Sequence, residues 1–376
     1  MTAHFRTAAG LLLSVLAGGC ARKTDAVGVA AAVTAANPAI EKGRAIYARL
    51  CSTCHGVAGH GYVADNAPSL RSPTFLASAT DDFLQAAILR GRPGTAMGAY
   101  ARATGGPIGP DEANDVIAFL REGGPPRADL PQVNSAGDAS RGKLLYESLC
   151  QRCHGTKTQR VSAIHLANPV LLETASDAFL RRAIEAGRPP TSMVPWKDTL
   201  TPQQIDDVVA YVRSMAAATP APPMLPSPPP QPPPAAPRRG PVVLNPKGRA
   251  PDFVLKEDRY VSIDQVKAAL DKKRRLVIAD ARSPAEWSSL HIVGAISTPY
   301  YDAKSLDDIP NDGTWVLAYC ACPHHVSGEV VDALRKRGYK HTAVIDEGVY
   351  AWQQAKYPVV AAPGLLPAAA PPPPHH

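Results

Sequence analysis

The chain has 376 residues, enough for two or three domains, and 45% of them are hydrophobic, which allows compact cores. The formal net charge is +7, but the positive excess is local, since residues 217–250 hold four basic residues and no acidic one. A binding face for nucleic acid would need a basic patch on a folded domain, so we expect no nucleic-acid partner.

The N-terminus has the features of an export signal. Arg6 precedes the apolar stretch AAGLLLSVLAGG, which is too short to span a membrane and ends at Cys20. A cysteine directly after small residues resembles a bacterial lipobox, although Ala17 stands where leucine is usual. We predict a signal peptide over 1–19, lipid on Cys20 and a tether over 20–37, which would anchor the protein to the periplasmic side of a membrane. The alternative is an ordinary cleaved signal with an incidental cysteine.

A cysteine-containing unit occurs twice. GRAIYARLCSTCHG at 43–56 is repeated as RGKLLYESLCQRCHG at 141–155. Both copies contain C-x-x-C-H, in which two thiols can form thioethers to haem while the adjacent histidine reaches the iron. The duplication argues against a redox dithiol or half a zinc site, and we predict two covalently bound haems c. The predicted residues are Cys51, Cys54 and His55 in the first copy and Cys150, Cys153 and His154 in the second.

A second repeated block predicts the distal ligands. DDFLQAAILRGRPGTAM aligns without a gap with DAFLRRAIEAGRPPTSM. Each copy is typical of a short helix that ends at glycine, followed by a proline-containing loop that presents a methionine. Methionine is usually a filler of cores, but here it recurs where a distal iron ligand is needed. We therefore predict that Met97 and Met193 ligate iron.

Each copy is expected to close with an amphipathic helix. One begins at Pro110, and the other has an N-cap at Thr201 followed by proline and glutamine in capping positions. On the opening helix of each copy, Gly43 or Gly142 precedes a tyrosine by four residues. A glycine there would let the closing helix cross closely.

These features resemble class I cytochrome c domains, over residues 38–123 and again over 136–216. The resemblance implies two all-α domains, electron transfer with redox partner proteins, and His/Met ligation that favours a relatively high potential. Arg92 and Arg188 are either partners of haem propionates or solvated surface residues.

Proline dominates the next segment. Residues 217–250 include PAPPMLPSPPPQPPPAAPRRGP, from which no core can be built, so we predict a semi-rigid polyproline spacer. A ligand for proline-binding modules is the alternative. The tail 362–376 contains PAAAPPPPHH and is predicted to be disordered.

Residues 251–361 alternate between strand and helix patterns, which predicts an α/β domain with a parallel sheet after the two all-α domains. The predicted strands are 276–280, 315–319 and 342–346, and the predicted helices are 262–270 and 328–338. Three motifs here, DARSPAEW, HIVGAISTP and DEGVYAW, resemble the rhodanese family. The family's nucleophile ends the strand before the second helix, and LAYC places Cys320 there. The resemblance implies that Cys320 attacks a sulfane sulfur, helped by the N-terminus of the following helix.

The loop CACPHH departs from the family pattern, because Pro323 lacks an N–H donor and no arginine is present. Cys322 could resolve a persulfide at Cys320, or could bind copper or zinc with His324 and His325. The loop could also be inert. The sequence therefore indicates an electron-transfer protein coupled to a sulfane-sulfur compound, or a two-haem carrier whose rhodanese-like fold only docks a partner.

Overall fold

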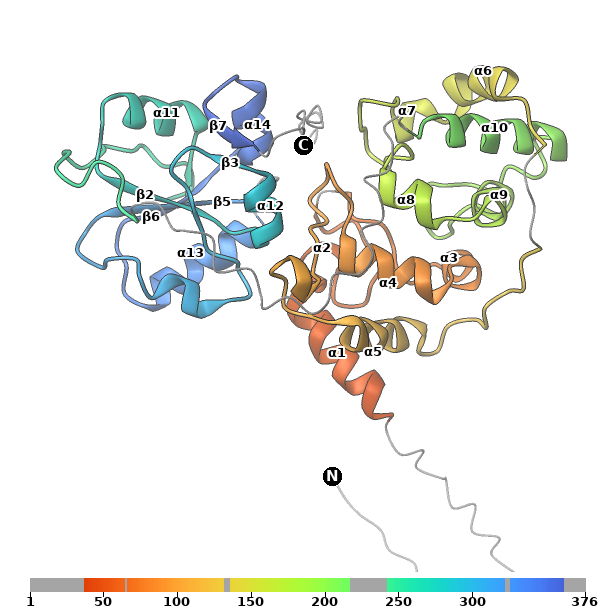
Figure 1. Ribbon diagram of the computed structural model, residues 1–376, viewed down its shortest axis with the longest axis horizontal. Helices are drawn as coiled ribbons and strands as arrows, with labels where there is room; N and C mark the ends of the chain where they lie inside the picture. Colours follow the sequence, from red (N-terminus) through yellow and green to blue (C-terminus); the bar gives the residue numbers. More distant parts are fainter. Residues whose placement is uncertain (1–36, 65, 132–135, 217–241, 322–324, 362–376) are drawn as a thin grey trace, which may run out of the picture. The chain divides into compact units, whose positions relative to one another are not determined.

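The computed structural model describes residues 37–64, 66–131, 136–216, 242–321 and 325–361 (Figure 1). These residues belong to one unit of the chain, which begins at Asn37. Several predictions concern residues outside the described ranges, namely the signal peptide, lipidation of Cys20, the spacer up to residue 241, the roles of Cys322 and His324, and the tail after residue 361.

Six helical segments form the first domain. They are α1 (Pro38–Leu50), α2 (Ser52–His55), α3 (Pro73–Ser78), α4 (Asp81–Arg90), the 3₁₀ turn η1 (Arg102–Thr104) and α5 (Pro110–Arg121). Helix α1 crosses α5 at Gly43, where an added Cβ would lie 1.9 Å from the carbonyl oxygen of Asp115. Only glycine fits this crossing, as the sequence indicated.

Five helices form the second domain. They are α6 (Ala139–Leu149), α7 (Gln151–His154), α8 (Pro169–Thr174), α9 (Asp177–Ala186) and α10 (Pro202–Ser214). Helix α10 begins with a capping box in which the Thr201 side chain accepts from the backbone N–H of Gln204 and the Gln204 side chain accepts from that of Thr201. Gly142 repeats the close crossing, since a Cβ there would lie 1.8 Å from the carbonyl oxygen of Asp207.

The two helical domains contact each other through equivalent positions of the repeat. The hydroxyl of Ser72, at the N-cap of α3, donates to the carbonyl oxygen of Pro189 at 2.8 Å. The side-chain amide of Asn168, at the N-cap of α8, donates to the carbonyl oxygen of Pro93 at 2.9 Å. Because these contacts are reciprocal, the repeats face each other in a roughly two-fold manner.

The C-terminal domain contains a five-stranded parallel sheet in the order β1-β6-β5-β2-β4, and a separate antiparallel pair, β3 and β7. The strands are β1 (Tyr260–Val261), β2 (Leu276–Asp280), β3 (Leu290–Ile292), β4 (Ile296–Ser297), β5 (Trp315–Tyr319), β6 (Thr342–Ile345) and β7 (Val359–Ala361). The helices are α11 (Ile263–Asp271), α12 (Pro284–Ser289), the 3₁₀ turn η2 (Ala303–Leu306), α13 (Val326–Lys336) and α14 (Gly348–Gln354).

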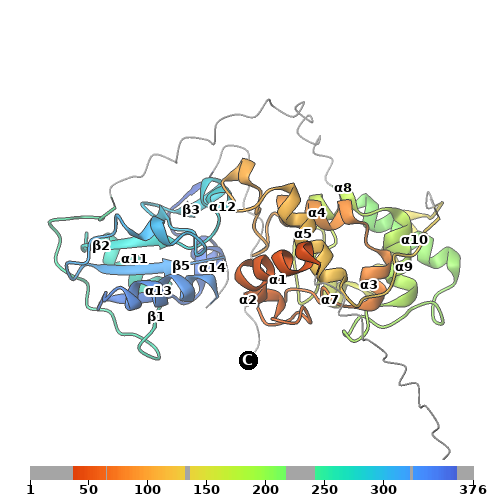
Figure 2. The same ribbon diagram turned by 90° about the horizontal axis from the view of Figure 1, so that it is seen from below.

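The central strands are buried on both faces. On β2, Leu276 and Ile278 pack with side chains of α11 and α14, whereas Val277 and Ala279 pack with side chains of α13. Helices therefore cover both faces of the sheet, with α11 and α13 on opposite sides of the strands in Figure 1 and overlapping them in Figure 2. This explains why β2 is a continuous apolar run, as is typical of parallel strands.

The predicted fold class, all-α cytochrome-like domains followed by an α/β domain with a parallel sheet, is confirmed. Helix α13 begins at Val326, so its N-terminus lies close after Cys320 in the chain, as expected from the sequence. Ordered packing begins before residue 251, because Leu244 pairs with Leu276 and contacts the sheet core. Within the described part of the chain, no helix is both long and apolar enough to cross a membrane.

Candidate functional site

The first C-x-x-C-H segment lies on α2, directly after α1. His55 is buried, and its Nδ1 lies 2.9 Å from the carbonyl oxygen of Pro68. A carbonyl oxygen only accepts hydrogen bonds, and burial lowers the pKa of the imidazole, so the neutral ring carries its proton on Nδ1. Nε2 then keeps its lone pair, which is the form of histidine that ligates iron.

The second segment, on α7, repeats this geometry. Nδ1 of His154 lies 2.8 Å from the carbonyl oxygen of Ile164, and burial again lowers the pKa of the ring. Tyr146 donates to the carbonyl oxygen of Gly155 at 2.9 Å, and the equivalent tyrosine and glycine of the first domain are 2.8 Å apart. Two segments far apart in the sequence thus hold their histidines in the same way.

The loops that carry the two methionines are also alike. The backbone N–H of Arg92 donates to the carbonyl oxygen of Met97 at 2.7 Å, and that of Arg188 donates to the carbonyl oxygen of Met193 at 2.8 Å. Each methionine therefore follows a short closed loop at the end of a helix, as the sequence predicted.

In the first domain, this loop faces the C-x-x-C-H segment. Ala96 and Gly98, on either side of Met97, line one pocket with Thr53 and Cys54. The fold therefore brings the loop that carries the predicted distal ligand to the segment that ends with the predicted proximal ligand.

Two arginines supply a further test of whether haem fits. The guanidinium carbon of Arg92 lies 5.2 Å from the centre of the Phe83 ring, and that of Arg188 lies 5.1 Å from the centre of the Phe179 ring. Burial lowers the pKa of both arginines to about 10. Nη1 of Arg92 and Nη2 of Arg188 are buried and have no hydrogen-bond partner among the described residues. Neither side chain is therefore a solvated surface residue.

These residues fit a covalently bound haem. Each domain offers a pair of thiols, a neutral imidazole, a methionine loop and a cation with one buried, unsatisfied N–H group that suits a propionate carboxylate. None of the described cysteines forms a disulfide, namely Cys51, Cys54, Cys150, Cys153 and Cys320.

The third candidate residue, Cys320, directly follows β5. Its side chain is buried, and its Sγ lies 3.3 Å from the hydroxyl oxygen of Ser327, the second residue of α13. The backbone N–H of Val349 donates to the carbonyl oxygen of Cys320 at 3.0 Å and fixes the strand end. The sulfur therefore lies beside the N-terminus of α13, which favours its thiolate form.

The neighbouring strand end holds a buried ion pair. Two nitrogens of Arg282 donate to the carboxylate of Asp280, at 2.6 and 2.9 Å, and the hydroxyl of Tyr319 donates to the same carboxylate at 2.7 Å. The Asp280 carboxylate, at the end of β2, thus joins this strand to Tyr319 of β5. Loss of either partner would leave an uncompensated buried charge, so the pair is required to keep this strand end, next to Cys320, in place.

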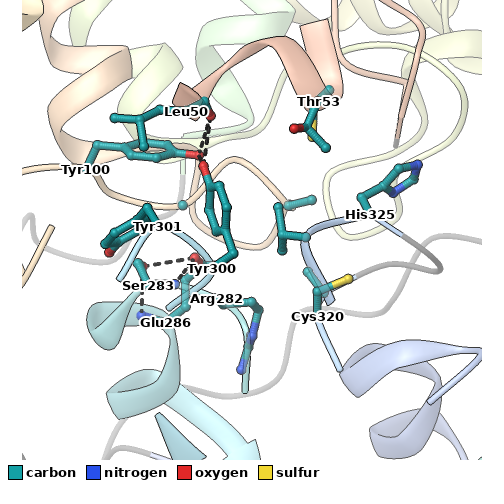
Figure 3. A pocket seen from close by; sticks show the side chains of 15 residues that line it. Leu50, Thr53, Tyr100, Arg282, Ser283, Glu286, Tyr300, Tyr301, Cys320 and His325 are labelled. Atoms are coloured by element: carbon teal, nitrogen blue, oxygen red, sulfur yellow. Dashed lines mark hydrogen bonds between the residues drawn. The ribbon is translucent and has the colours of Figure 1, made fainter. Parts of the chain in front are cut away.

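Glu286 caps α12 near this pair. Its carboxylate accepts from the backbone N–H of Ser283 at 3.2 Å and from the Ser283 hydroxyl at 2.9 Å. Burial raises the pKa of Glu286 to about 7, and its Oε1 has no hydrogen-bond partner among the described residues. Ser283, Glu286 and Cys320 line one pocket, together with His325 (Figure 3). Two residues of the CACPHH loop, Cys320 and His325, therefore lie at one site.

Known protein families match all three domains. A family model for cytochrome c matches residues 40–123. A model for subunit III of cbb3-type cytochrome c oxidase matches residues 137–212, and a model for the rhodanese-like domain matches residues 262–355. The chain joins two cytochrome c domains to a rhodanese-like domain.

Individual relatives cover parts of this arrangement. The cbb3-type cytochrome c oxidase subunit FixP of Bradyrhizobium diazoefficiens is 28% identical over 46% of this chain and 60% of its own length. The probable adenylyltransferase/sulfurtransferase MoeZ of Mycobacterium tuberculosis is 34% identical over 24% of this chain and 23% of its own length. The chain thus spans less than two thirds of either relative. A rhodanese-like domain from Anabaena sp., solved by NMR, is 23% identical, with a TM-score of 0.27, and covers 30% of this chain and 86% of that domain.

Some residues of the cytochrome and rhodanese-like sites carried no signal in the sequence. Pro68 and Ile164 act through backbone carbonyl oxygens, so their residue types say nothing about this role. Ser327 carries a weak signal, since a hydroxyl residue near the start of the helix after the predicted nucleophile, Cys320, is well placed to contact it.

Proposed function

We propose that this electron-transfer protein binds two haems c and couples them to sulfur chemistry at Cys320. Attachment would use the two cysteine pairs, with His55 and Met97 as iron ligands in the first domain and His154 and Met193 in the second. When bound, haem c supplies a one-electron carrier in each domain. The proposed sulfur chemistry is supported by one observation: the thiol of Cys320 is buried and lies beside Ser327 and the N-terminus of α13.

Transfer of sulfur to Cys320 needs no net electron flow. The thiolate attacks the outer sulfur of thiosulfate, a new sulfur–sulfur bond forms, and the old bond breaks with its electron pair leaving on sulfite. Cys322 would then be the residue that resolves the persulfide, in competition with an external acceptor.

Coupling to electron transfer requires an oxidation as well. When the Cys320 thiolate joins hydrosulfide, the products are the persulfide anion, one proton and two electrons. Two haems, each of which carries one electron, could together accept both electrons. This gives a reason for a rhodanese-like domain to occur in one chain with two cytochrome c domains. The proposed substrate class is therefore a small reduced-sulfur anion.

The proposed location is the periplasmic side of a bacterial membrane, where lipid on Cys20 would anchor the chain. The proposed partners are redox proteins, which is consistent with cytochrome relatives that are oxidase subunits. The haems would pass the electrons released at Cys320 to such a partner protein.

The full-length holoprotein tests the proposal under anaerobic conditions. Hydrosulfide and thiosulfate are added separately, haem reduction is followed by absorbance, and the peptide with Cys320 is examined by mass spectrometry for one extra sulfur atom. Cys320→Ser should remove both signals, whereas Cys322→Ser should retain or accumulate the adduct. If haem reduction is equal in wild type and Cys320→Ser, and no adduct forms on Cys320, the sulfur function is rejected. The protein would then be a two-haem electron carrier whose rhodanese-like domain only docks a partner.

A further inference from the structure

The pocket at Cys320 is lined by two domains. Cys320 and His325 come from the rhodanese-like domain, and Leu50, Thr53 and Cys54 come from the first cytochrome c domain (Figure 3). The second cytochrome c domain contributes none of the described residues that line it. The nucleophile therefore shares one cavity with a haem-attachment segment.

Two tyrosines, one from each domain, connect the two sides of this pocket. Tyr300 donates its hydroxyl to the carbonyl oxygen of Leu50 at 2.9 Å, and Tyr100 donates to the same oxygen at 3.1 Å. The two hydroxyl oxygens are themselves 3.1 Å apart. Burial raises the pKa of both tyrosines well above the usual value, so both remain neutral donors. Leu50 directly precedes Cys51, so this cluster holds the start of the haem-attachment segment.

A second contact links the same segment to the helix that begins beside Cys320. Thr53, between the two attachment cysteines, donates its hydroxyl to Oε1 of Glu329 at 2.7 Å. Glu329 lies in the first turn of α13. Glu329 remains exposed to solvent, and partial desolvation raises the pKa of its carboxyl.

A third contact depends on a glycine. A Cβ added at Gly98, which follows Met97, would lie 2.1 Å from Oε2 of Glu286. The carboxylate of Glu286 is fixed by Ser283, so it cannot move aside without losing hydrogen bonds. A side chain at residue 98 would therefore have to displace this carboxylate from its hydrogen bonds with Ser283.

The second cytochrome c domain differs at each of these positions. In the repeat, Arg152 stands in place of Thr53, Val194 in place of Gly98, and Trp196 in place of Tyr100. Valine in place of Gly98 would clash with Glu286, and Arg152 and Trp196 differ from Thr53 and Tyr100 in length, shape and the position of their donor groups. The two repeats are therefore not interchangeable as neighbours of the rhodanese-like domain.

We propose that the first cytochrome c domain is the specific, built-in docking partner of the rhodanese-like domain, and that Cys320 and the segment from Leu50 to Cys54 form one composite sulfur site. Tyr100, Tyr300, Thr53 and Gly98 are its positioning residues. The identity of the occupant, a sulfur anion bound to Cys320, rests on the proposed function. The docking itself does not.

Docking is measured by how fast Cys320 reacts with iodoacetamide in the full-length holoprotein, followed by peptide mass spectrometry. Tyr300→Phe removes hydrogen bonds worth roughly 1 kcal/mol or more and should raise the rate about three- to tenfold. Gly98→Val introduces a clash and should raise it by roughly tenfold or more. Tyr300→Phe leaves the methionine loop untouched, so it remains decisive if Gly98→Val disturbs haem ligation.

Two matched controls are available. Tyr339→Phe removes another tyrosine hydroxyl that donates to a backbone carbonyl, within the rhodanese-like domain alone. Val194→Leu adds bulk at the equivalent position of the second cytochrome c domain. Both should leave the rate unchanged.

The outcomes separate docking from sulfur chemistry. If Cys320 reacts with iodoacetamide at the wild-type rate in both Tyr300→Phe and Gly98→Val, the docking proposal is wrong. It is also wrong if the control Tyr339→Phe raises this rate as much as Tyr300→Phe does. A selective rise supports docking even if thiosulfate and hydrosulfide leave no adduct on Cys320, a result that would reject only the proposed sulfur function.

Discussion

The hydroxyl oxygen of Ser327 lies 3.3 Å from Sγ of Cys320. Ser327 is fully buried, and Pro323, which lies between the two in sequence, has no N–H to offer. A hydroxyl donor at this distance stabilises a thiolate or a persulfide anion, since hydrogen bonds to charged groups are the stronger ones.

We expect Ser327→Ala to slow sulfur loading of Cys320 by roughly tenfold or more, because a hydrogen bond to a charged group is lost. The rate of adduct formation with thiosulfate, measured by mass spectrometry, checks this. Ser289→Ala removes a hydroxyl that donates to Ala285 on α12 and should have no effect. Equal rates in Ser327→Ala and wild type would show that the contact does not act on the sulfur.

Replacement of either methionine should affect one haem only. We expect Met97→Ala to remove the methionine–iron absorption band and lower the potential of the haem in the first domain, and Met193→Ala to do the same in the second. Absorption spectra and redox titrations of the holoprotein measure both effects. If both bands survive both substitutions, other residues are the distal ligands.

The residues that the sequence predicted well are those with local signals. The C-x-x-C-H spacing, the capping box at Thr201 and the close-crossing glycines Gly43 and Gly142 each depend on neighbours in the chain or on a residue type that only one geometry requires. The parallel sheet followed from apolar runs and intervening helices. Those features could be read directly from the sequence.

The residues that sequence analysis did not identify act across the fold. The tyrosine pair of Tyr100 and Tyr300 joins residues 200 positions apart, and Thr53 and Glu329 are 276 positions apart. Neither side chain in such a pair has a local pattern that points to the other. Their roles depend on how domains pack, which no periodicity or spacing within one segment encodes.

The close helix crossing in the second cytochrome c domain predicts a strong effect of a single methyl group. In Gly142→Ala, the added Cβ would lie 1.8 Å from the carbonyl oxygen of Asp207, so α6 and α10 must separate. We expect this domain to lose about 1–3 kcal/mol of unfolding free energy. Denaturant titration followed by haem absorbance measures this. Lys143→Ala, at the exposed neighbouring position, should change stability little, and a similar loss in both variants would reject the crossing argument.

The proposed lipid anchor gives a direct test of location. In Cys20→Ser, no thiol remains for lipid attachment, so the protein should move from the membrane fraction to the soluble periplasmic fraction. Cell fractionation and immunoblotting measure the distribution. Membrane association that persists unchanged in Cys20→Ser would indicate an uncleaved signal or a membrane-bound partner.

Glu286 should make the stability of the rhodanese-like domain depend on pH. Burial raises the pKa of this carboxyl from its ordinary value of 4.5 to about 7. Between these two values, the folded state binds a proton that the unfolded state has released, so folding stability falls as pH rises through this window. Glu286→Gln removes the penalty of charging a buried group. It should therefore match wild type near pH 4.5 and exceed it by up to about 3 kcal/mol above about pH 8.

Urea unfolding of the full-length holoprotein tests this, with tryptophan fluorescence as the probe. Three of the four tryptophans, Trp287, Trp315 and Trp352, lie in the rhodanese-like domain. Glu257→Gln, at an exposed position, is the control and should follow wild type at every pH. If the difference between Glu286→Gln and wild type does not grow with pH, the buried carboxyl is not the group that titrates, and its charge is compensated by Arg282 in the folded protein.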